Sequence, residues 1–109
     1  MIAVTILGNN SAIPAHSRHP TAQILQTTEQ VVLIDCGEGT QMQMRLYKIK
    51  RSKINLIFIS HMHGDHYFGL IGLLNSMALN NRSEDLHIYA PEKLKHIIDI
   101  QLNAADAGF

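Results

Sequence analysis

The chain has 109 residues, a length that allows one domain with a real hydrophobic core. Nine Lys and Arg balance nine Asp and Glu, which excludes a globally basic surface for nucleic acid, while 46% hydrophobic and 17% charged residues are typical of a soluble globular protein. No apolar run approaches the ~20 residues of a membrane span, and the N-terminus lacks the pattern of a signal peptide. The single cysteine excludes an internal disulfide and favours a cytoplasmic location.

The first third of the chain predicts a three-stranded meander, because short runs of branched apolar residues alternate with turn residues. Strands are expected over residues 2–7, 21–26 and 31–34, with a loop at 8–20 and a turn at 27–30. The loop contains Arg18 and His19, which are interpreted either as a cationic contact or as part of a solvated surface.

The segment that closes the third strand has the sequence DCGEGTQ. Its two glycines flank Glu38 and predict a backbone packed closely against a neighbouring segment. Asp35 is expected either to hydrogen-bond a metal-binding histidine or, with Glu38, to accept turn amides. Cys36 is predicted to be a small buried hydrophobe, and Thr40 to be the N-cap of a short helix ending near Tyr47.

Four cations precede the next strand: Lys48, Lys50, Arg51 and Lys53. A solvated connection between two elements explains them. A contact with phosphate groups is the sharper alternative, because lysine and arginine neutralise phosphates in nucleic-acid complexes.

The centre of the chain combines an apolar run with a cluster of metal-binding side chains. Residues 56–59 are short and β-branched, which predicts a buried parallel strand. His61, His63, Asp65 and His66 follow at once, where open α/β sheets place their sites. In an extended turn His61 and His63 point the same way and can hold one ion, while Asp65 and His66 face a neighbouring position.

The chemistry of this cluster predicts half of a two-metal centre. Imidazole nitrogens with a carboxylate suit zinc, with manganese or iron as alternatives, and two ligands do not complete a tetrahedral site. Gly64 is expected to omit a side chain where the turn is tightest and to supply a φ angle that other residues avoid. Polar turn residues that cap a helix would explain any one of these histidines, but not four ligand-type groups in six positions.

The remaining pattern predicts a helix, a strand and a second helix, at residues 65–79, 86–89 and 92–103. Pro91 is expected at the first helical position of the last helix. His87 and His96 have no neighbouring ligand groups and are therefore predicted to be structural or exposed.

Two of these motifs resemble known enzymes. The sequence HMHGDH at residues 61–66 matches the HxHxDH signature of the metallo-β-lactamase superfamily. The DCGEGTQ segment resembles that of ribonuclease Z, the tRNA 3′-end processing endonuclease, and Leu7-Gly8 followed by Pro14 and Arg18 is similar to that family's first loop. The fifth strand and the Ala90-Pro91-Glu92 segment keep its order of elements, so the likeness extends over essentially the whole chain.

The resemblance implies an α/β fold in which residues 1–109 form a single partial domain, the N-terminal half of a metallo-β-lactamase-type αββα sandwich. It implies one zinc ion on His61 and His63 and a second on Asp65 and His66, with Asp65 also accepting a proton. The implied reaction removes the 3′ trailer from precursor tRNA and leaves a 3′-hydroxyl on the tRNA. The implied enzyme is a homodimer in the cytoplasm.

The departure from this family is one of length. The family needs two further histidines and a bridging aspartate, which would lie beyond Phe109, so the chain alone is expected to bind zinc weakly or not at all and to be inactive. Half a sandwich also leaves one apolar sheet face uncovered, which favours self-association. Two alternatives stand beside ribonuclease Z: another hydrolase of the superfamily (a phosphodiesterase, arylsulfatase or lactonase), and a non-enzymatic module stabilised by metal.

Overall fold

The structure is a computed structural model that describes residues 1–9 and 18–105, so most of the loop expected at residues 8–20 lies outside the described residues. The chain forms five strands, three α-helices and two short 3-10 helices in the described parts. In order these are β1 (Ala3–Gly8), β2 (Ala22–Gln26), β3 (Val31–Ile34), α1 (Thr40–Leu46), η1 (Arg51–Lys53), β4 (Ile54–Phe58), η2 (Gly64–His66), α2 (Leu70–Leu79), β5 (His87–Tyr89) and α3 (Glu92–Ala104).

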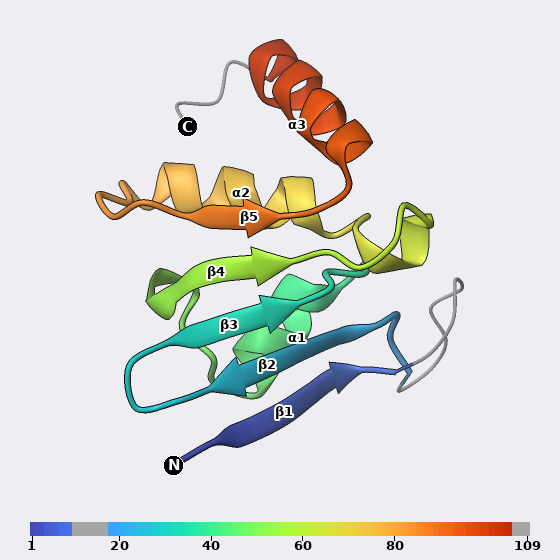
Figure 1. Cartoon of the computed structure of the whole chain (residues 1–109). Helices are drawn as coiled ribbons and strands as arrows, with labels where there is room; N and C mark the ends of the chain where they lie inside the picture. The colour runs from blue at the N-terminus through green and yellow to red at the C-terminus, as the bar shows by residue number, and fades with distance from the viewer. Residues whose placement is uncertain (10–17, 106–109) are drawn as a thin grey trace.

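The strands form one sheet in the order β1-β2-β3-β4-β5 (Figure 1). The expected meander is confirmed, because β1, β2 and β3 pair antiparallel through adjacent connections. The chain then crosses over through α1 and again through α2, so β4 pairs parallel with both β3 and β5. The register sets Leu33 of β3 beside Ile24 of β2 and Ile57 of β4, and all three side chains are fully buried.

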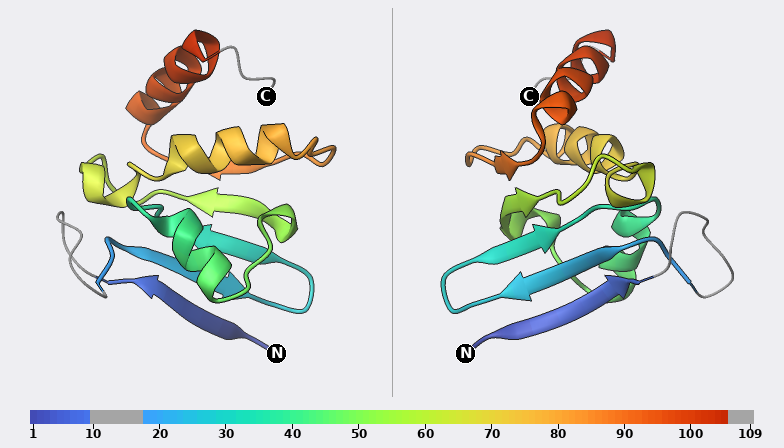
Figure 2. Two further views of the ribbon diagram at one scale, coloured as in Figure 1. Left: turned by 180° about the vertical axis from the view of Figure 1, so that it is seen from behind. Right: turned by 45° about the vertical axis from the view of Figure 1, so that its right-hand side comes forward.

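One face of the sheet carries the hydrophobic core. Both α1 and α2 lie across this face (Figure 2, left), and their buried residues include Met44, Leu73 and Leu74. Helix α3 lies beyond β5 and packs against α2, with Leu94 buried in the same cluster. Apolar residues at helical spacing on the three helices therefore meet the alternate apolar residues of the strands.

Within the described residues, no helix covers the other face of the sheet (Figure 1). Phe58 and Tyr89 are 41% and 56% exposed, and their rings stack with centroids 5.1 Å apart. Val4 and Ile6 of β1 are exposed as well. The uncovered face predicted from the sequence is therefore present. The prediction that residues 56–59 form a buried strand is only half right: β4 is buried on one face only, because the exposed Phe58 follows the fully buried Ile57.

Three element boundaries differ from the prediction. Thr40 is the first residue of α1 rather than its N-cap: Gly39 precedes it with a φ of 85°, and the Thr40 hydroxyl donates to the Gly37 carbonyl at 2.6 Å. Helix α2 begins at Leu70 rather than near Asp65, because the polar turn takes the separate conformation of η2. Pro91 stands before α3 with an extended ψ of 144°, so it is not the first helical residue.

Candidate metal centre

The predicted metal-binding residues lie at the carboxyl end of β4, where β3 and β5 also end (Figure 1). Backbone pairing continues past β4, since the Ile59 amide donates to the Tyr89 carbonyl at 2.9 Å. The chain then leaves the sheet through an extended segment and η2, which carries Asp65 and His66. The carboxyl ends of parallel strands leave backbone groups unpaired and side chains convergent, so the location agrees with that of sites in open α/β sheets.

The structure brings the four predicted side chains together. The His61 and His63 rings are nearly parallel, within 7°, with centroids 6.1 Å apart. The His61 and His66 rings are 4.7 Å apart, and His66 Nε2 lies 3.6 Å from Asp65 Oδ2. His61 and His63 are exposed, whereas the side chains of Asp65 and His66 are about one-fifth exposed. All four groups are therefore open to a ligand from solvent.

These donors fit part of a metal site rather than a complete one. Three imidazoles and one carboxylate are the ligand types that zinc and related ions use in hydrolases. In the part of the chain that the structure describes, however, no three His, Cys, Asp or Glu side chains are arranged to hold one ion together. The described donors therefore supply only part of a coordination shell for any one ion.

A buried carboxylate supports the cluster from the neighbouring strand end. Asp35 is 5% exposed, and its carboxylate accepts hydrogen bonds from the Ser60 amide at 2.8 Å and the Ser60 hydroxyl at 2.9 Å. Its Oδ2 lies 2.9 Å from His66 Nδ1. Asp35 therefore contacts a histidine of the motif and also accepts a backbone amide, that of Ser60.

The same network selects one tautomer for two histidines. A carboxylate only accepts hydrogen bonds, so His66 Nδ1 carries the proton that bonds Asp35. If the Ser60 hydroxyl donates its proton to Asp35, its oxygen can accept from His61 Nδ1, which lies 2.9 Å away. In this tautomer Nε2 of each ring is unprotonated and its lone pair is available to bind a metal ion, as in metal-binding histidines. The sequence did not single out Ser60 as a residue of the site. The one feature that could have done so is its position directly after a predicted strand and before His61.

Close backbone packing holds the polar turn against the DCGEGTQ segment, as the glycines predicted. The Cys36 amide donates to the His66 carbonyl at 2.8 Å. A Cβ on Gly37 would lie 2.6 Å from the Asp65 carbonyl oxygen and 2.5 Å from Pro20 Cβ, so no larger residue fits. Gly64 has no room for a side chain beneath the Phe68 ring, but its φ is not positive, and that part of the prediction is wrong.

Cys36 is fully buried, and desolvation by burial raises the pKa of its thiol to about 12, with a lowering contribution from the Thr40 hydrogen bond and a raising one from Asp35. The thiol is therefore protonated at neutral pH and behaves as the small hydrophobe that was predicted. His87 and His96 are exposed, away from the motif, also as predicted. Glu38 is exposed, and no hydrogen bond of its side chain is present among the described residues.

The four cations at residues 48–53 lie at the other end of β4 from the histidines. Arg51 and Lys53 belong to η1, and Lys48 and Lys50 come just before it, so all four precede the strand, whereas the histidine cluster follows it. Five strand residues at ~3.3 Å each place about 16 Å between the two groups. A phosphate held at the histidines is therefore out of their reach, and any phosphate that these cations bind is a different one.

Comparisons with known proteins show which family and which relatives the chain is similar to. Residues 2–105 match the family described as "Anti-Pycsar protein Apyc1". The chain is 45% identical over 98 residues to a ribonuclease Z of Bacteroides fragilis, which covers 90% of this chain and 32% of that protein. It is 46% identical over 96 residues to a ribonuclease Z of Methanococcus aeolicus, covering 88% of this chain and 30% of that protein. The chain thus spans about a third of the length of these relatives.

Solved structures show the same likeness. The short form of human tRNase Z superposes with a TM-score of 0.90 at 39% identity, covering 99% of this chain and 40% of that one. A metallo-β-lactamase-fold protein of Bacillus subtilis superposes with a TM-score of 0.72 at 24% identity, covering 82% of this chain and 37% of that one, which shows the fold alone. The predicted α/β class and metallo-β-lactamase-type architecture are confirmed. Within the described residues no helix is long and apolar enough to cross a membrane.

Proposed function

We infer the function from a family relationship: this chain belongs to the family described as "Anti-Pycsar protein Apyc1" and resembles ribonuclease Z of the metallo-β-lactamase superfamily. We propose that residues 1–109 form a single partial domain of a metal-dependent endoribonuclease that removes the 3′ trailer from precursor tRNA. One observation carries this proposal: in a chain 45% identical to a ribonuclease Z, all four HxHxDH donors gather at the carboxyl end of β4.

Two divalent ions, with zinc as the first choice and manganese as the second, would lower the pKa of an attacking water and stabilise charge on the phosphodiester. His61 and His63 would hold one ion, and Asp65 and His66 the other. Asp35 and Ser60 keep the Nε2 lone pairs of His61 and His66 available. The Asp65 carboxylate, whose Oδ2 lies 3.6 Å from His66 Nε2, would accept a proton in the reaction.

This chain supplies only part of the coordination shell in the proposal. Because no three of the described donors are arranged to hold one ion, we expect residues 1–109 alone to bind zinc weakly or not at all and to leave precursor tRNA intact. The remaining ligands and a second sheet layer would come from sequence equivalent to the other two-thirds of the relatives. The working protein is proposed to be a homodimer in the cytoplasm. Tight, stoichiometric binding of zinc by the isolated, monomeric chain would contradict the proposal that this chain supplies only some of the metal ligands.

The decisive experiment is cleavage of a precursor tRNA with a 3′ trailer by the full product of this reading frame, supplied with zinc or manganese. Cleavage at the trailer boundary, leaving a 3′-hydroxyl on the tRNA, is the expected result. His63→Ala should abolish the cut, while His96→Ala, an exposed histidine on α3, should leave it unchanged. A folded, metal-loaded protein that leaves the trailer in place would remove tRNA as its substrate.

A second candidate is a hydrolase of the same superfamily that acts on a different phosphodiester. The matching family description does not name ribonuclease Z, and this favours keeping the candidate open. A small chromogenic diester, bis(p-nitrophenyl) phosphate, separates the two. Turnover of this diester without cleavage of precursor tRNA, lost in His63→Ala, would support the second candidate over the first. Metal-dependent stability without any hydrolysis would support a non-enzymatic module instead.

A further inference from the structure

Helix α1 carries exposed apolar residues on the side that faces away from the core. Met42 and Leu46 are 68% and 69% exposed, whereas Thr40 and Met44 are buried. Each pair is four residues apart, so each pair lies on one side of the helix, and the two sides are opposite. Phe68, in the turn that precedes α2, adds a third exposed apolar side chain. Helix α1 therefore has two contact sides, and the described chain covers one of them.

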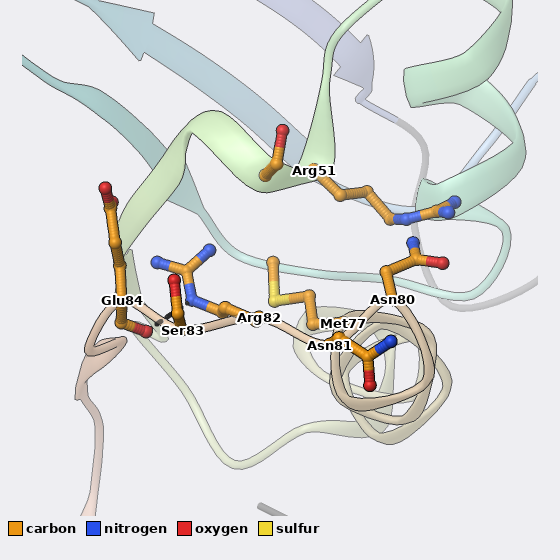
Figure 3. A pocket seen from close by; sticks show the side chains of 8 residues that line it. Arg51, Met77, Asn80, Asn81, Arg82, Ser83 and Glu84 are labelled. Carbon is orange, nitrogen blue, oxygen red and sulfur yellow. Dashed lines mark hydrogen bonds between the residues drawn. The ribbon is translucent and has the colours of Figure 1, made fainter.

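A hollow of about 420 Å³ adjoins these exposed residues, between α1 and the start of α2. Met42 lines it from α1, and Gly72 lines it from α2. Arg51 connects the two helices along the hollow: its Nη1 donates to Gln41 Oε1 of α1 at 3.4 Å, and its side chain extends toward Asn80 at the end of α2 (Figure 3). The two walls of the hollow are therefore fixed relative to each other.

Gly72 lies in the first turn of α2 and is exposed. Within the described chain, a Cβ at this position would have one contact, with the Gln41 amide nitrogen at 3.3 Å. Alanine stabilises a helix more than glycine does, so the packing of this chain alone would favour alanine here. An exposed glycine in the wall of the hollow instead leaves room for another molecule to approach closely.

The two ends of this surface carry opposite charges. Glu38 lies in the turn before α1 and Arg45 in its last turn, and both line the hollow together with Met42. Both charged residues are exposed, and among residues 1–9 and 18–105 neither forms an ion pair within 4.0 Å. The order along α1 is therefore negative, apolar and positive, with Met42 midway between the two charges.

This order of charges makes the surface complementary to a second copy of itself. If two copies pack their α1 helices antiparallel about a two-fold axis, Glu38 of each copy faces Arg45 of the other, and the two Met42 side chains meet near the axis. An apolar centre with a charged rim is the usual composition of such interfaces. The uncovered face of the sheet lies on the other side of the molecule from α1 (Figure 2), so a second sheet layer on that face leaves this surface free.

We propose that the outer surface of α1 is the docking site for a second copy of this chain. Glu38 and Arg45 form two symmetry-related ion pairs across the interface. Met42 and Leu46 form its apolar centre, and the hollow beside Gly72 receives a side chain of the partner. The proposal specifies the surface of the homodimer proposed above, and it rests on that part of the proposed function alone.

Sedimentation equilibrium of the full product of this reading frame measures the dissociation constant of the dimer. Met42→Glu places two carboxylates near the axis and should raise that constant about tenfold or more, because a buried charge without a partner disfavours association. Ile100→Glu is the matched control: Ile100 is 69% exposed on α3, and its variant should dimerise as the native sequence does. Circular dichroism and urea unfolding check the fold of each variant.

Charge reversal tests the antiparallel pairing itself. Glu38→Arg and Arg45→Glu should each weaken the dimer about tenfold, because each variant sets like charges against each other twice. The Glu38→Arg/Arg45→Glu double variant restores opposite pairs and should dimerise almost as tightly as the native sequence. Lys93→Glu, which makes the same change of charge as Arg45→Glu at an exposed position of α3, should have no effect.

Three association results would overturn the proposal: a monomeric full-length protein, a Met42→Glu dimer as tight as that of Ile100→Glu, and a double charge reversal that dimerises more weakly than either single one. Unfolding of Met42→Glu, in place of dissociation, would show that the rest of the chain covers α1 instead of a second copy, and this too would overturn it. Because the measurement contains no precursor tRNA, loss of this proposal leaves the proposed nuclease untouched, and loss of the nuclease leaves the dimer surface untouched.

Discussion

Asp35 Oδ2 and His66 Nδ1 lie 2.9 Å apart, although 31 residues separate them in the chain. The contact joins the end of β3 to the polar turn after β4, because these parallel strands end side by side. Asp35 adopts a positive φ of 60° to reach it, a conformation that Asp and Asn tolerate better than other side chains. The link between the sheet and the HxHxDH turn therefore follows from the strand pairing.

Asp35→Asn should weaken zinc binding to the full-length protein about 10–100-fold, the usual effect of losing a carboxylate behind a metal-binding histidine. Asparagine keeps the size and the positive φ, so the loss reports the charge and the acceptor oxygen. Competition with a chromogenic chelator measures the affinity, and Asp99→Asn on the exposed face of α3 is the control. Equal affinities for the two variants would show that Asp35 acts only on the backbone turn.

Ser60→Ala should reduce zinc affinity by about 2–10-fold, because one neutral hydrogen bond contributes about 0.5–1.5 kcal/mol. The hydroxyl accepts from His61 Nδ1 at 2.9 Å, and without it this ring turns more freely. Ser60→Thr keeps the hydroxyl and should restore most of the affinity. The same chelator competition applies, and a threonine variant as weak as the alanine variant would argue against the tautomer role.

Gly37→Ala should destabilise the fold by about 1–3 kcal/mol, the cost of forcing extra atoms into a packed site. Its Cβ would collide with the Asp65 carbonyl oxygen and with Pro20. Gly72→Ala in α2 is the matched control, because its Cβ meets only the flexible Gln41 amide at 3.3 Å, and alanine favours helix by about 1 kcal/mol. Urea unfolding should show opposite shifts of the midpoint for the two variants.

The buried thiol of Cys36 predicts a loss of stability at high pH. Its folded-state pKa, about 12, lies above the ordinary value of 9.0, so its contribution is complete below pH 9 and is lost as pH rises toward 12. A shift of this size corresponds to at most about 4 kcal/mol. Urea unfolding between pH 8 and pH 11 should show a steeper decline for the native sequence than for Cys36→Ala. Parallel declines would contradict burial of a protonated thiol.

The bare sheet face predicts association of the isolated 109-residue chain. Phe58 and Tyr89 stack in the open on this face, and exposed apolar patches of this kind drive contacts between molecules. Phe58→Glu with Tyr89→Glu should shift the chain toward smaller species in sedimentation velocity. Ile100→Glu, which removes an exposed apolar side chain from α3, should not. An unsubstituted chain that is monomeric at high concentration would count against the idea.

Local features were predicted from the sequence because they are encoded locally. The HxHxDH donors, the three-stranded meander and the helices α1 and α3 follow from residue types and spacing within one segment. The start of α2 was missed because the apolar pattern continues from the turn into the helix, whereas the turn has its own conformation at η2. The spacing of apolar residues indicates which face of a helix is buried, but it does not indicate at which residue the helix begins after a polar turn.

Only the tertiary structure decided which distant residues meet. The pairing of β3 with β4 brings Asp35 and Ser60 behind the histidines, and the crossover through α2 brings Arg82 beside Arg51 at the other end of the sheet. Neither pair has a signal in sequence spacing, because strand order and register arise from burial summed over the whole sheet. The sequence by itself determined the residue types of the HxHxDH turn. The fold determined which residues support that turn and separated it from the cations at residues 48–53.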